Sequence, residues 1–252
     1  MEGGNELNKN GKIYVVGIGP GDKKHMTFKA VEAIEKSDIV IGYKKYIELI
    51  EDMIDSKKIV SSQMKKEVER CEKTLEYAED GKVVALVSSG DAGVYGMAGI
   101  MIEVLLKKNS TVDIEVIPGV SAANASAACV GAPIMHDFAT ISLSDLLTDW
   151  SLIEKRIHCA GEGDFVITIY NPRSKKRQEQ IVISREILLN YKSKSTPVAI
   201  VRNAKREDEE IVLTDLEHML DHNIDMFTTL IIGNSKSYIK GGKMVTPRGY
   251  RI

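Results

Sequence analysis

Short apolar runs alternate with amphipathic segments along the chain. In the first half, runs rich in valine and isoleucine occupy residues 12–19, 38–42, 82–89 and 112–118. Runs of this length and composition predict strands that are buried on both faces of a sheet. The segments between them predict helices that cover that sheet.

The clearest predicted helix lies before the third of these strands. Its apolar positions recur at spacings of four and three residues, and they are Met64, Val68, Cys71, Leu75 and Ala78. This spacing places them on one helical face, and Gly81 follows as a natural C-terminal cap. We therefore expect a helix that packs this stripe against the sheet.

The second half repeats the alternation. Its apolar runs are residues 138–143, 164–170, 197–203, 209–214 and 228–234. About nine strands separated by helices suit two smaller sheets better than one. We predict two α/β domains, residues 11–120 and 121–252, after a flexible N-terminus at 1–10, with the seam in the Gly-, Ala- and Ser-rich stretch 118–133. The final stretch, 241–252, is expected to be a loop or tail.

Composition argues against several functional classes. The 34 basic and 36 acidic residues leave a net charge of −2, which argues against broad capture of nucleic acid or of an anionic membrane. No stretch of roughly 18 apolar residues occurs, so a water-soluble protein is predicted. Cys71, Cys129 and Cys159 are too widely spaced for a disulfide framework or a CxxC metal site, which favours the cytoplasm.

Three glycine-rich segments follow predicted strands, at residues 17–22 (GIGPGD), 88–96 (SSGDAGVYG) and 118–123 (PGVSAA). The first departs from a dinucleotide fingerprint, because Asp22 stands where a small residue is needed and Pro20 lacks an amide for a phosphate. Each segment alone could be a plain turn. Three of them at successive strand ends predict a ligand crevice.

The succession GIGPGD, SSGDAGVYG and PGVSAANA resembles the tetrapyrrole methylase family. Members of that family are two-domain α/β enzymes that bind S-adenosylmethionine in the cleft between the domains, so the resemblance implies this fold and this methyl donor. The family commonly has Gly-Asp-Pro where this chain has Gly90, Asp91 and Ala92.

Motifs of the second half narrow the resemblance. They are GAPIMHDFATISLSDLLTDW, GDFVITIYNPRSKKR, TTLIIGNS and GGKMVTPRGY, and the matches together span residues 11–250. These motifs are similar to the branch that methylates carbon 17 of precorrin-3 and contracts its ring in cobalamin biosynthesis. In this branch, Asp-Ala is expected at positions 91 and 92. The resemblance therefore implies a tetrapyrrole (precorrin) substrate and a homodimer, and any cobalt would travel with the substrate.

The resemblance also implies a methyl-donor site. Its residues would be Pro20, Ser89, Gly90, Asp91, Val94, Ser121 and Ala122 from the first part of the chain, and Asn171, Ala204 and Thr229 from the second. Ala204 replaces a frequent glycine. All of these positions fall at or near the ends of predicted strands.

Arg173, His136 and Asp137 are the candidate catalytic residues. Arg173 belongs to the dense basic cluster 171–177, and a guanidinium binds the acetate and propionate groups of a precorrin in bidentate geometry. The alternative for 175–177 is a solvated helix start. His136 and Asp137, together with Asp145, could move a proton during ring contraction or could serve only as structural caps.

His218 and His222 have the spacing of a metal pair on one helical face, but no further ligand is evident near them. We interpret them as surface residues and predict no protein-bound metal.

The implied methyl transfer needs no protein nucleophile, because the electron-rich macrocycle attacks the sulfonium methyl directly. Orientation in a closed cleft is then the main task of the enzyme. Ring contraction needs either acid/base help or a substrate carboxylate that forms a lactone. Two alternatives stay open: a nicotinamide-dependent oxidoreductase that uses the 17–22 loop, and a non-catalytic porphyrinoid-binding protein.

Overall fold

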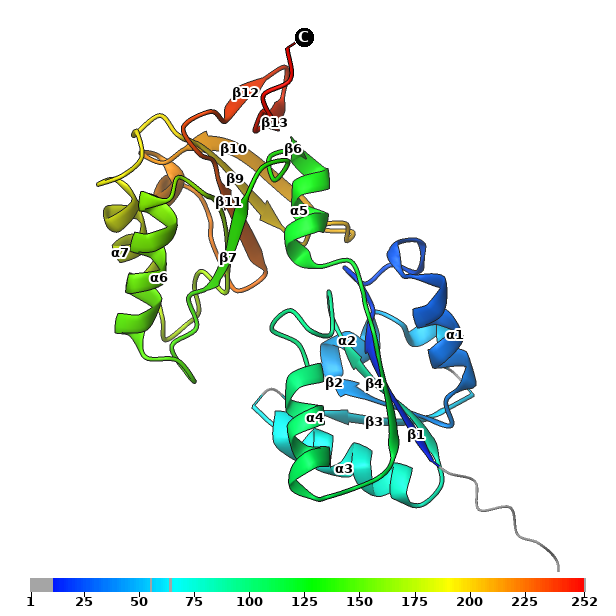
Figure 1. The fold of residues 1–252 in the computed structure, drawn as a ribbon. Coiled ribbons are helices and arrows are strands. Elements are labelled where there is room, and N and C mark those ends of the chain that lie inside the picture. The colour runs from blue at the N-terminus through cyan, green and yellow to red at the C-terminus, as the bar shows by residue number, and fades with distance from the viewer. Residues whose placement is uncertain (1–10, 55, 64, 252) are drawn as a thin grey trace, which may run out of the picture. The chain divides into compact units, whose positions relative to one another are not determined.

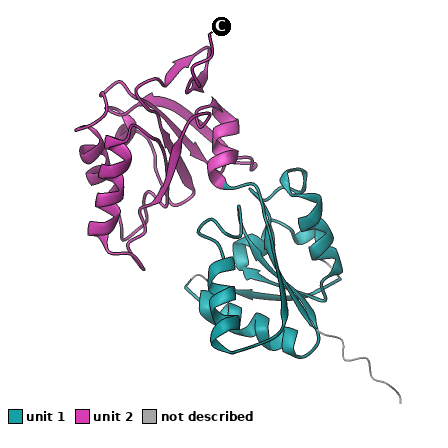
Figure 2. Ribbon diagram, viewed as in Figure 1, with its two compact units in different colours: residues 1–121 teal, residues 122–252 magenta. Residues whose placement is uncertain are grey.

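The computed structural model describes residues 11–54, 56–63 and 65–251. The chain forms two compact units, with unit 1 ending at Ser121 and unit 2 beginning at Ala122 (Figure 2). Both are α/β units, as the sequence predicts. The N-terminus at 1–10, predicted to be flexible, lies outside the described residues.

Unit 1 contains a five-stranded parallel sheet (Figure 1). Its strands are β1 (Lys12–Gly17), β2 (Ile39–Tyr43), β3 (Lys58–Ser62), β4 (Val83–Ser88) and β5 (Asp113–Ile117), in the order β3-β2-β4-β1-β5. The central strand β4 and its neighbour β1 are buried almost throughout. This burial explains their unbroken runs of apolar residues.

Helices cover both faces of this sheet. They are α1 (Phe28–Lys36), α2 (Lys44–Glu48), α3 (Glu67–Glu79) and α4 (Ala98–Lys107), with short 3-10 turns η1 (Lys23–His25) and η2 (Glu51–Met53). Cys71 and Leu75 of α3 pack with Met101 of α4 in one core cluster. Ile34 of α1 and Ile47 of α2 pack in the cluster on the other face.

The predicted stripe on α3 is only partly correct. Cys71, Leu75 and Ala78 are buried as expected, and Gly81 ends the helix with a φ of 78°. Val68, however, is 56% exposed, and Met64 lies outside the described residues. The helix begins only at Glu67, so the buried face is completed by Arg70 and Thr74 instead.

Unit 2 has a mixed five-stranded sheet. Its strands are β7 (Phe138–Ser142), β8 (Val166–Tyr170), β9 (Pro197–Arg202), β10 (Glu210–Asp215) and β11 (Thr228–Ile232), in the order β10-β9-β11-β8-β7. β7 and β8 are parallel, whereas β11 runs antiparallel to β8 and β9. Consequently the start of β11 lies beside the ends of β8 and β9.

The helices of unit 2 are α5 (Ala122–Val130), α6 (Trp150–Glu162) and α7 (Glu179–Leu188), with the 3-10 turn η3 (Met219–Asp221). Residues of α6 and α7 pack in the larger core cluster, with Ile157 and Ile181 fully buried. Ala127 of α5 packs in the smaller one. No helix in the described part of the chain is long and apolar enough to span a bilayer.

Among the described residues, four strands were not predicted from the sequence pattern. β3 is an edge strand whose residues are mostly exposed, so it has no apolar run. β6 (Gly131–Ala132), β12 (Tyr238–Lys240) and β13 (Lys243–Val245) are two or three residues long and form a small separate sheet. The prediction of a loop or tail after residue 240 was therefore wrong for β13, where Met244 is fully buried.

Candidate functional site

The glycine-rich loops of unit 1 meet at the carboxyl ends of its parallel strands. β4, β1 and β5 are neighbours and parallel, so their carboxyl ends lie together. Gly19 and Gly90 exchange two backbone hydrogen bonds, with N···O distances of 2.9 and 2.7 Å. These bonds join the loop after β1 to the loop after β4.

The third loop packs against the other two through backbone atoms. A Cβ atom on Gly17 would lie 2.7 Å from the nitrogen of Gly119 and 2.8 Å from the carbonyl oxygen of Gly90. Real Cβ atoms do not approach backbone this closely. We call Gly17, Gly19, Gly90 and Gly119 the glycine platform. The glycines are required here for close packing of three loops, which is more than a plain turn needs.

Asp91 links the platform internally. Its Oδ1 accepts from the Gly93 amide at 2.8 Å, and its Oδ2 accepts from the Gly119 amide at 3.0 Å. Both carboxylate oxygens therefore hold loop backbone. Asp91 was predicted as a residue of the methyl-donor site, and this geometry gives it a role in shaping the loops.

The other predicted donor-site residues of unit 1 lie around the platform. Pro20 is buried and Ser89 is half-buried, whereas Val94 is exposed at 38%. Ser121 is the last residue of the unit and is half-buried.

The loop after β1 does not build a dinucleotide site. Asp22 caps η1, because its Oδ1 accepts from the Lys24 amide at 2.7 Å. The helix α1 starts only at Phe28, where Thr27 is the N-cap and accepts from the Ala30 amide at 3.1 Å. A pyrophosphate site needs the glycine turn to lead directly into the helix N-terminus, and here six residues separate them.

Unit 2 brings the predicted methyl-donor residues of the second half of the chain to one end of its sheet, and Ala122, which the prediction grouped with the first half, also belongs to this unit. Asn171 directly follows β8, and Ala204 follows β9 by two residues. Thr229 lies at the start of β11, paired with Val201, and is nearly buried. Ala122 begins α5, whose next residue donates its amide to the Tyr170 hydroxyl at 2.8 Å.

The basic cluster after β8 divides into buried and exposed members. Ser174 and Arg177 close a tight turn with two backbone hydrogen bonds, which leaves Lys175 and Lys176 exposed at its tip. Arg177 is 8% exposed, so the solvated-run alternative fails for this residue. Arg173 is half-buried, and its Nε is buried without a partner within the described residues.

His136 and Asp137 lie at the end of the sheet where β7 and β8 begin, and Arg173 lies at the end where these strands finish. They precede β7, whereas Arg173 follows β8, and these two strands are parallel with Phe138 paired to Val166. The structure thus does not bring the three candidate catalytic residues together. The backbone amide of Asp137 donates to His136 Nδ1 at 2.8 Å. Both residues line a cavity of about 470 Å³ together with Asp164, Lys236 and Arg248.

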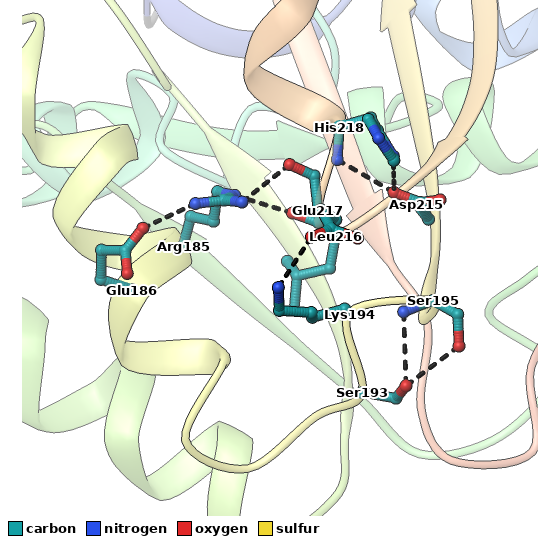
Figure 3. A network of polar contacts seen from close by, with 9 residues as sticks. All are labelled: Arg185, Glu186, Ser193, Lys194, Ser195, Asp215, Leu216, Glu217 and His218. Carbon is teal, nitrogen blue, oxygen red and sulfur yellow. Dashed lines mark hydrogen bonds and ion pairs between the residues drawn. The ribbon is translucent and has the colours of Figure 1, made fainter.

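Two further sequence candidates have structural contacts. Asp145 follows β7 and lies at the same end of the sheet as Arg173. Its Oδ2 accepts a hydrogen bond from Gln180 Nε2 at 2.8 Å, and its Oδ1 is 3.9 Å from Arg177 Nη1. His218 Nδ1 lies 2.8 Å from Asp215 Oδ1, and Figure 3 shows the imidazole turned toward that carboxylate. Hydrogen bonding to Asp215 raises the pKa of His218.

His218 and His222 flank η3 rather than sharing the face of a longer helix. No group of three side chains suited to a metal ion occurs in the part of the chain that was described.

The sequence did not predict the contacts of Ser142, Tyr170 and Arg177, although Arg177 lies in the basic cluster 171–177. Ser142 Oγ accepts from Asn171 Nδ2 at 3.0 Å, and Arg177 Nη2 donates to the Asn171 carbonyl at 2.8 Å. The only sequence signal was that Tyr170 and Arg177 flank the predicted loop; nothing in the sequence indicated that Arg177 turns inward.

Comparisons with known proteins agree with this architecture. The profile of the Tetrapyrrole (Corrin/Porphyrin) Methylases matches residues 12–220. A cobalt-factor III methyltransferase from Priestia megaterium is 52% identical over 96% of this chain, which spans 45% of that relative's length. A probable cobalt-factor III C(17)-methyltransferase from Salmonella typhimurium is 47% identical, covering 95% of this chain and 100% of the relative.

A solved structure is also closely similar. The crystal structure of the methyltransferase CobJ superimposes with a TM-score of 0.88 at 32% identity, covering 94% of this chain and 100% of that one. The profile match and these identities extend over both α/β units. The chain belongs to the tetrapyrrole (corrin/porphyrin) methylase family.

Proposed function

We propose that this enzyme transfers a methyl group from S-adenosylmethionine to carbon 17 of cobalt-factor III, the precorrin-3-level macrocycle of cobalamin biosynthesis, with contraction of the ring. The observation that carries the proposal is the interlocked glycine platform, in a chain 47% identical over its length to a probable C(17)-methyltransferase. A shaped backbone surface suits a reaction whose main requirement is orientation of two reactants.

The methyl donor would bind at the glycine platform of unit 1 and at the Asn171 edge of unit 2. The sulfonium of the methyl donor loses its charge during transfer, and the Asp91 carboxylate at the platform is already engaged by the Gly93 and Gly119 amides. In-line displacement by the macrocycle needs no protein nucleophile.

Arg173 would hold a substrate carboxylate. Its Nε is buried without a partner in the described structure, and such a donor gains most from a ligand that supplies an acceptor. A precorrin carries acetate and propionate groups that match a guanidinium fork. Lys175 and Lys176 are exposed and lack this desolvation.

The metal is proposed to belong to the substrate. Both relatives described above carry cobalt-factor III in their names, which supports a cobalt-containing macrocycle over a metal-free one. Cobalt held by the macrocycle needs no protein ligand.

Ring contraction is proposed to use a carboxylate of the substrate that forms a lactone. His136 and Asp137 were the protein candidates for this step. Their position before β7 puts them at the other edge of the sheet from Arg173, so we do not assign them to it.

The decisive experiment incubates the purified protein with labelled S-adenosylmethionine and either cobalt-factor III or metal-free precorrin-3B. We expect a methylated, ring-contracted product from the cobalt macrocycle, identified by mass and absorption. Binding of the macrocycle without methyl transfer would favour the porphyrinoid-binding alternative. Reduction or oxidation of a nicotinamide cofactor, with no binding of S-adenosylhomocysteine, would favour the oxidoreductase.

We also propose that the protein is a cytoplasmic homodimer. Cys71, Cys129 and Cys159 are all free thiols, which suits a reducing compartment. Leu146 and Leu147 are 65% and 97% exposed, and such apolar side chains favour burial against a second copy. Light scattering that reports a monomer at micromolar concentration would contradict the dimer.

A further inference from the structure

Asn171 has an unusual backbone conformation for its sequence context. Its φ is 50°, in the left-handed region that a non-glycine residue seldom adopts. Pro172 follows it, and a proline ring drives the preceding residue toward extended conformations. Strained backbone of this kind persists only where the surroundings hold it, and it concentrates at functional sites.

Two side-chain contacts hold Asn171 in place. Its own Nδ2 donates to Ser142 Oγ at 3.0 Å, which ties it to the end of β7. Its carbonyl oxygen accepts from Arg177 Nη2 at 2.8 Å. The second contact fixes the peptide group that joins Asn171, the residue with the unusual φ, to Pro172.

Arg177 reaches this carbonyl because its backbone turns back toward it. The Ser174 amide donates to the Arg177 carbonyl at 2.8 Å, and the Arg177 amide donates to the Ser174 carbonyl at 3.2 Å. The side chain is then enclosed, with Asp145 Oδ1 at 3.9 Å from Nη1 as its nearby carboxylate. Gln180 Nε2 in turn donates to Asp145 at 2.8 Å.

Enclosure of this cation is costly. Arg177 Nε is buried without a hydrogen-bond partner in the described residues, and burial lowers the pKa of the guanidinium although Asp145 opposes the shift. Lys175 and Lys176, two and one positions earlier, are exposed. A surface lysine at position 177 would avoid this cost, so the buried guanidinium needs a compensating role.

We propose that Arg177 is a positioning residue that fixes the left-handed turn at Asn171 and thereby shapes the unit 2 edge that receives the methyl donor. It acts through the Asn171 carbonyl and touches neither donor nor macrocycle. This inference rests on the proposed function, because that function is what assigns binding of the methyl donor to Asn171.

The test compares Arg177→Gln and Arg177→Lys with Lys176→Gln, which removes a positive charge from the exposed tip of the same turn. S-adenosylhomocysteine binding is measured by calorimetry, and folding is checked by circular dichroism. We expect Arg177→Gln to weaken binding about 10-fold or more, the size of a lost hydrogen bond from a charged donor. Arg177→Lys should restore part of the affinity, and Lys176→Gln should match the parent.

A second readout is independent of the ligand. The side-chain amide of Asn171, which is hydrogen-bonded to Ser142, should give distinct NMR signals in the parent. We expect the chemical shifts of these signals to change in Arg177→Gln and to remain unchanged in Lys176→Gln. Parental affinity and parental Asn171 signals in folded Arg177→Gln would overturn the inference; if that variant does not fold, the same result in folded Arg177→Met, which has no side-chain donor for the Asn171 carbonyl, would do so. Failure of the parent itself to bind S-adenosylhomocysteine would instead refute the proposed function, while the Asn171 signals would still test the geometry.

Discussion

A Cβ atom on Gly17 would lie 2.7 Å from the backbone nitrogen of Gly119, although the two residues are about a hundred positions apart in the chain. We predict that Gly17→Ala forces the loops after β1 and β5 apart. The expected cost is about 1–3 kcal/mol in the free energy of unfolding, as for other overpacked sites. Chemical denaturation would measure this cost, and calorimetry should show weaker binding of S-adenosylhomocysteine.

Gly99→Ala is the matched control. Gly99 is exposed in α4, and beyond its chain neighbours and the backbone of its own helix no heavy atom lies within 4 Å of its added Cβ. Alanine should stabilise the helix there by about 0.5–1 kcal/mol. If both substitutions had the same effect on stability, the close packing of the platform would not be what requires glycine at position 17.

The strands that lead into these loops follow from the sequence pattern. Buried central strands such as β1 and β4 have long Val- and Ile-rich runs, so their positions follow from composition, and the glycines after them mark the loops. Contacts between loops depend on strand order. The order β4-β1-β5, which brings Gly90 beside Gly119, is a tertiary property that no local run records.

The positions of the candidate side chains are a second property that the local sequence pattern does not determine. His136 and Arg173 lie in adjacent matching motifs, but His136 precedes a strand and Arg173 follows the next parallel one, so they occupy opposite edges. Arg177 was hidden for a different reason. Its burial depends on the turn that Ser174 closes, whereas its sequence neighbours are ordinary surface lysines.

Arg173→Ala should impair the use of the tetrapyrrole and spare the methyl donor. The loss of a charge-assisted hydrogen bond is worth about 1.5–3 kcal/mol, so we expect the KM for the macrocycle to rise roughly 10- to 150-fold. Affinity for S-adenosylhomocysteine should stay close to the parent's. Steady-state kinetics at limiting substrate, beside Lys175→Ala as a surface control, would check this. Parental turnover of Arg173→Ala at limiting substrate would refute the carboxylate contact.

The three free cysteines should differ sharply in reactivity. Burial raises the pKa of the Cys71 thiol to about 12, so at pH 8 only about 1 part in 10,000 is the reactive thiolate. Burial, with the Glu209 carboxylate, also raises the pKa of Cys129, whereas Cys159 is exposed. We expect one fast equivalent with a thiol reagent in the folded protein, and none in Cys159→Ser. A fast reaction that survives this substitution would show that another cysteine is accessible.

The pair of Asp215 and His218 predicts a local pH dependence of stability. Hydrogen bonding to Asp215 raises the pKa of His218 above its ordinary 6.5. The contribution of protonated His218 to the free energy of unfolding is therefore complete below pH 6.5, and it disappears as pH rises through the raised pKa. Desolvation opposes ionisation of Asp215, but hydrogen bonds from His218 outweigh it and lower the pKa of the carboxyl below 3.8. That contribution disappears only as pH falls through the lowered value.

Asp215→Asn should therefore return the titration of the His218 imidazole toward 6.5, measured by NMR. Glu186→Gln is a suitable control, because Glu186 belongs to the same polar network but contacts Arg185 rather than His218 (Figure 3). It removes one negative charge and leaves the hydrogen bond between Asp215 and His218 intact. Since an exposed charge is screened by solvent, only the direct partner should shift the titration appreciably. Equal shifts in the two variants would mean that the net charge of the network, and not the contact with Asp215, sets the protonation of His218.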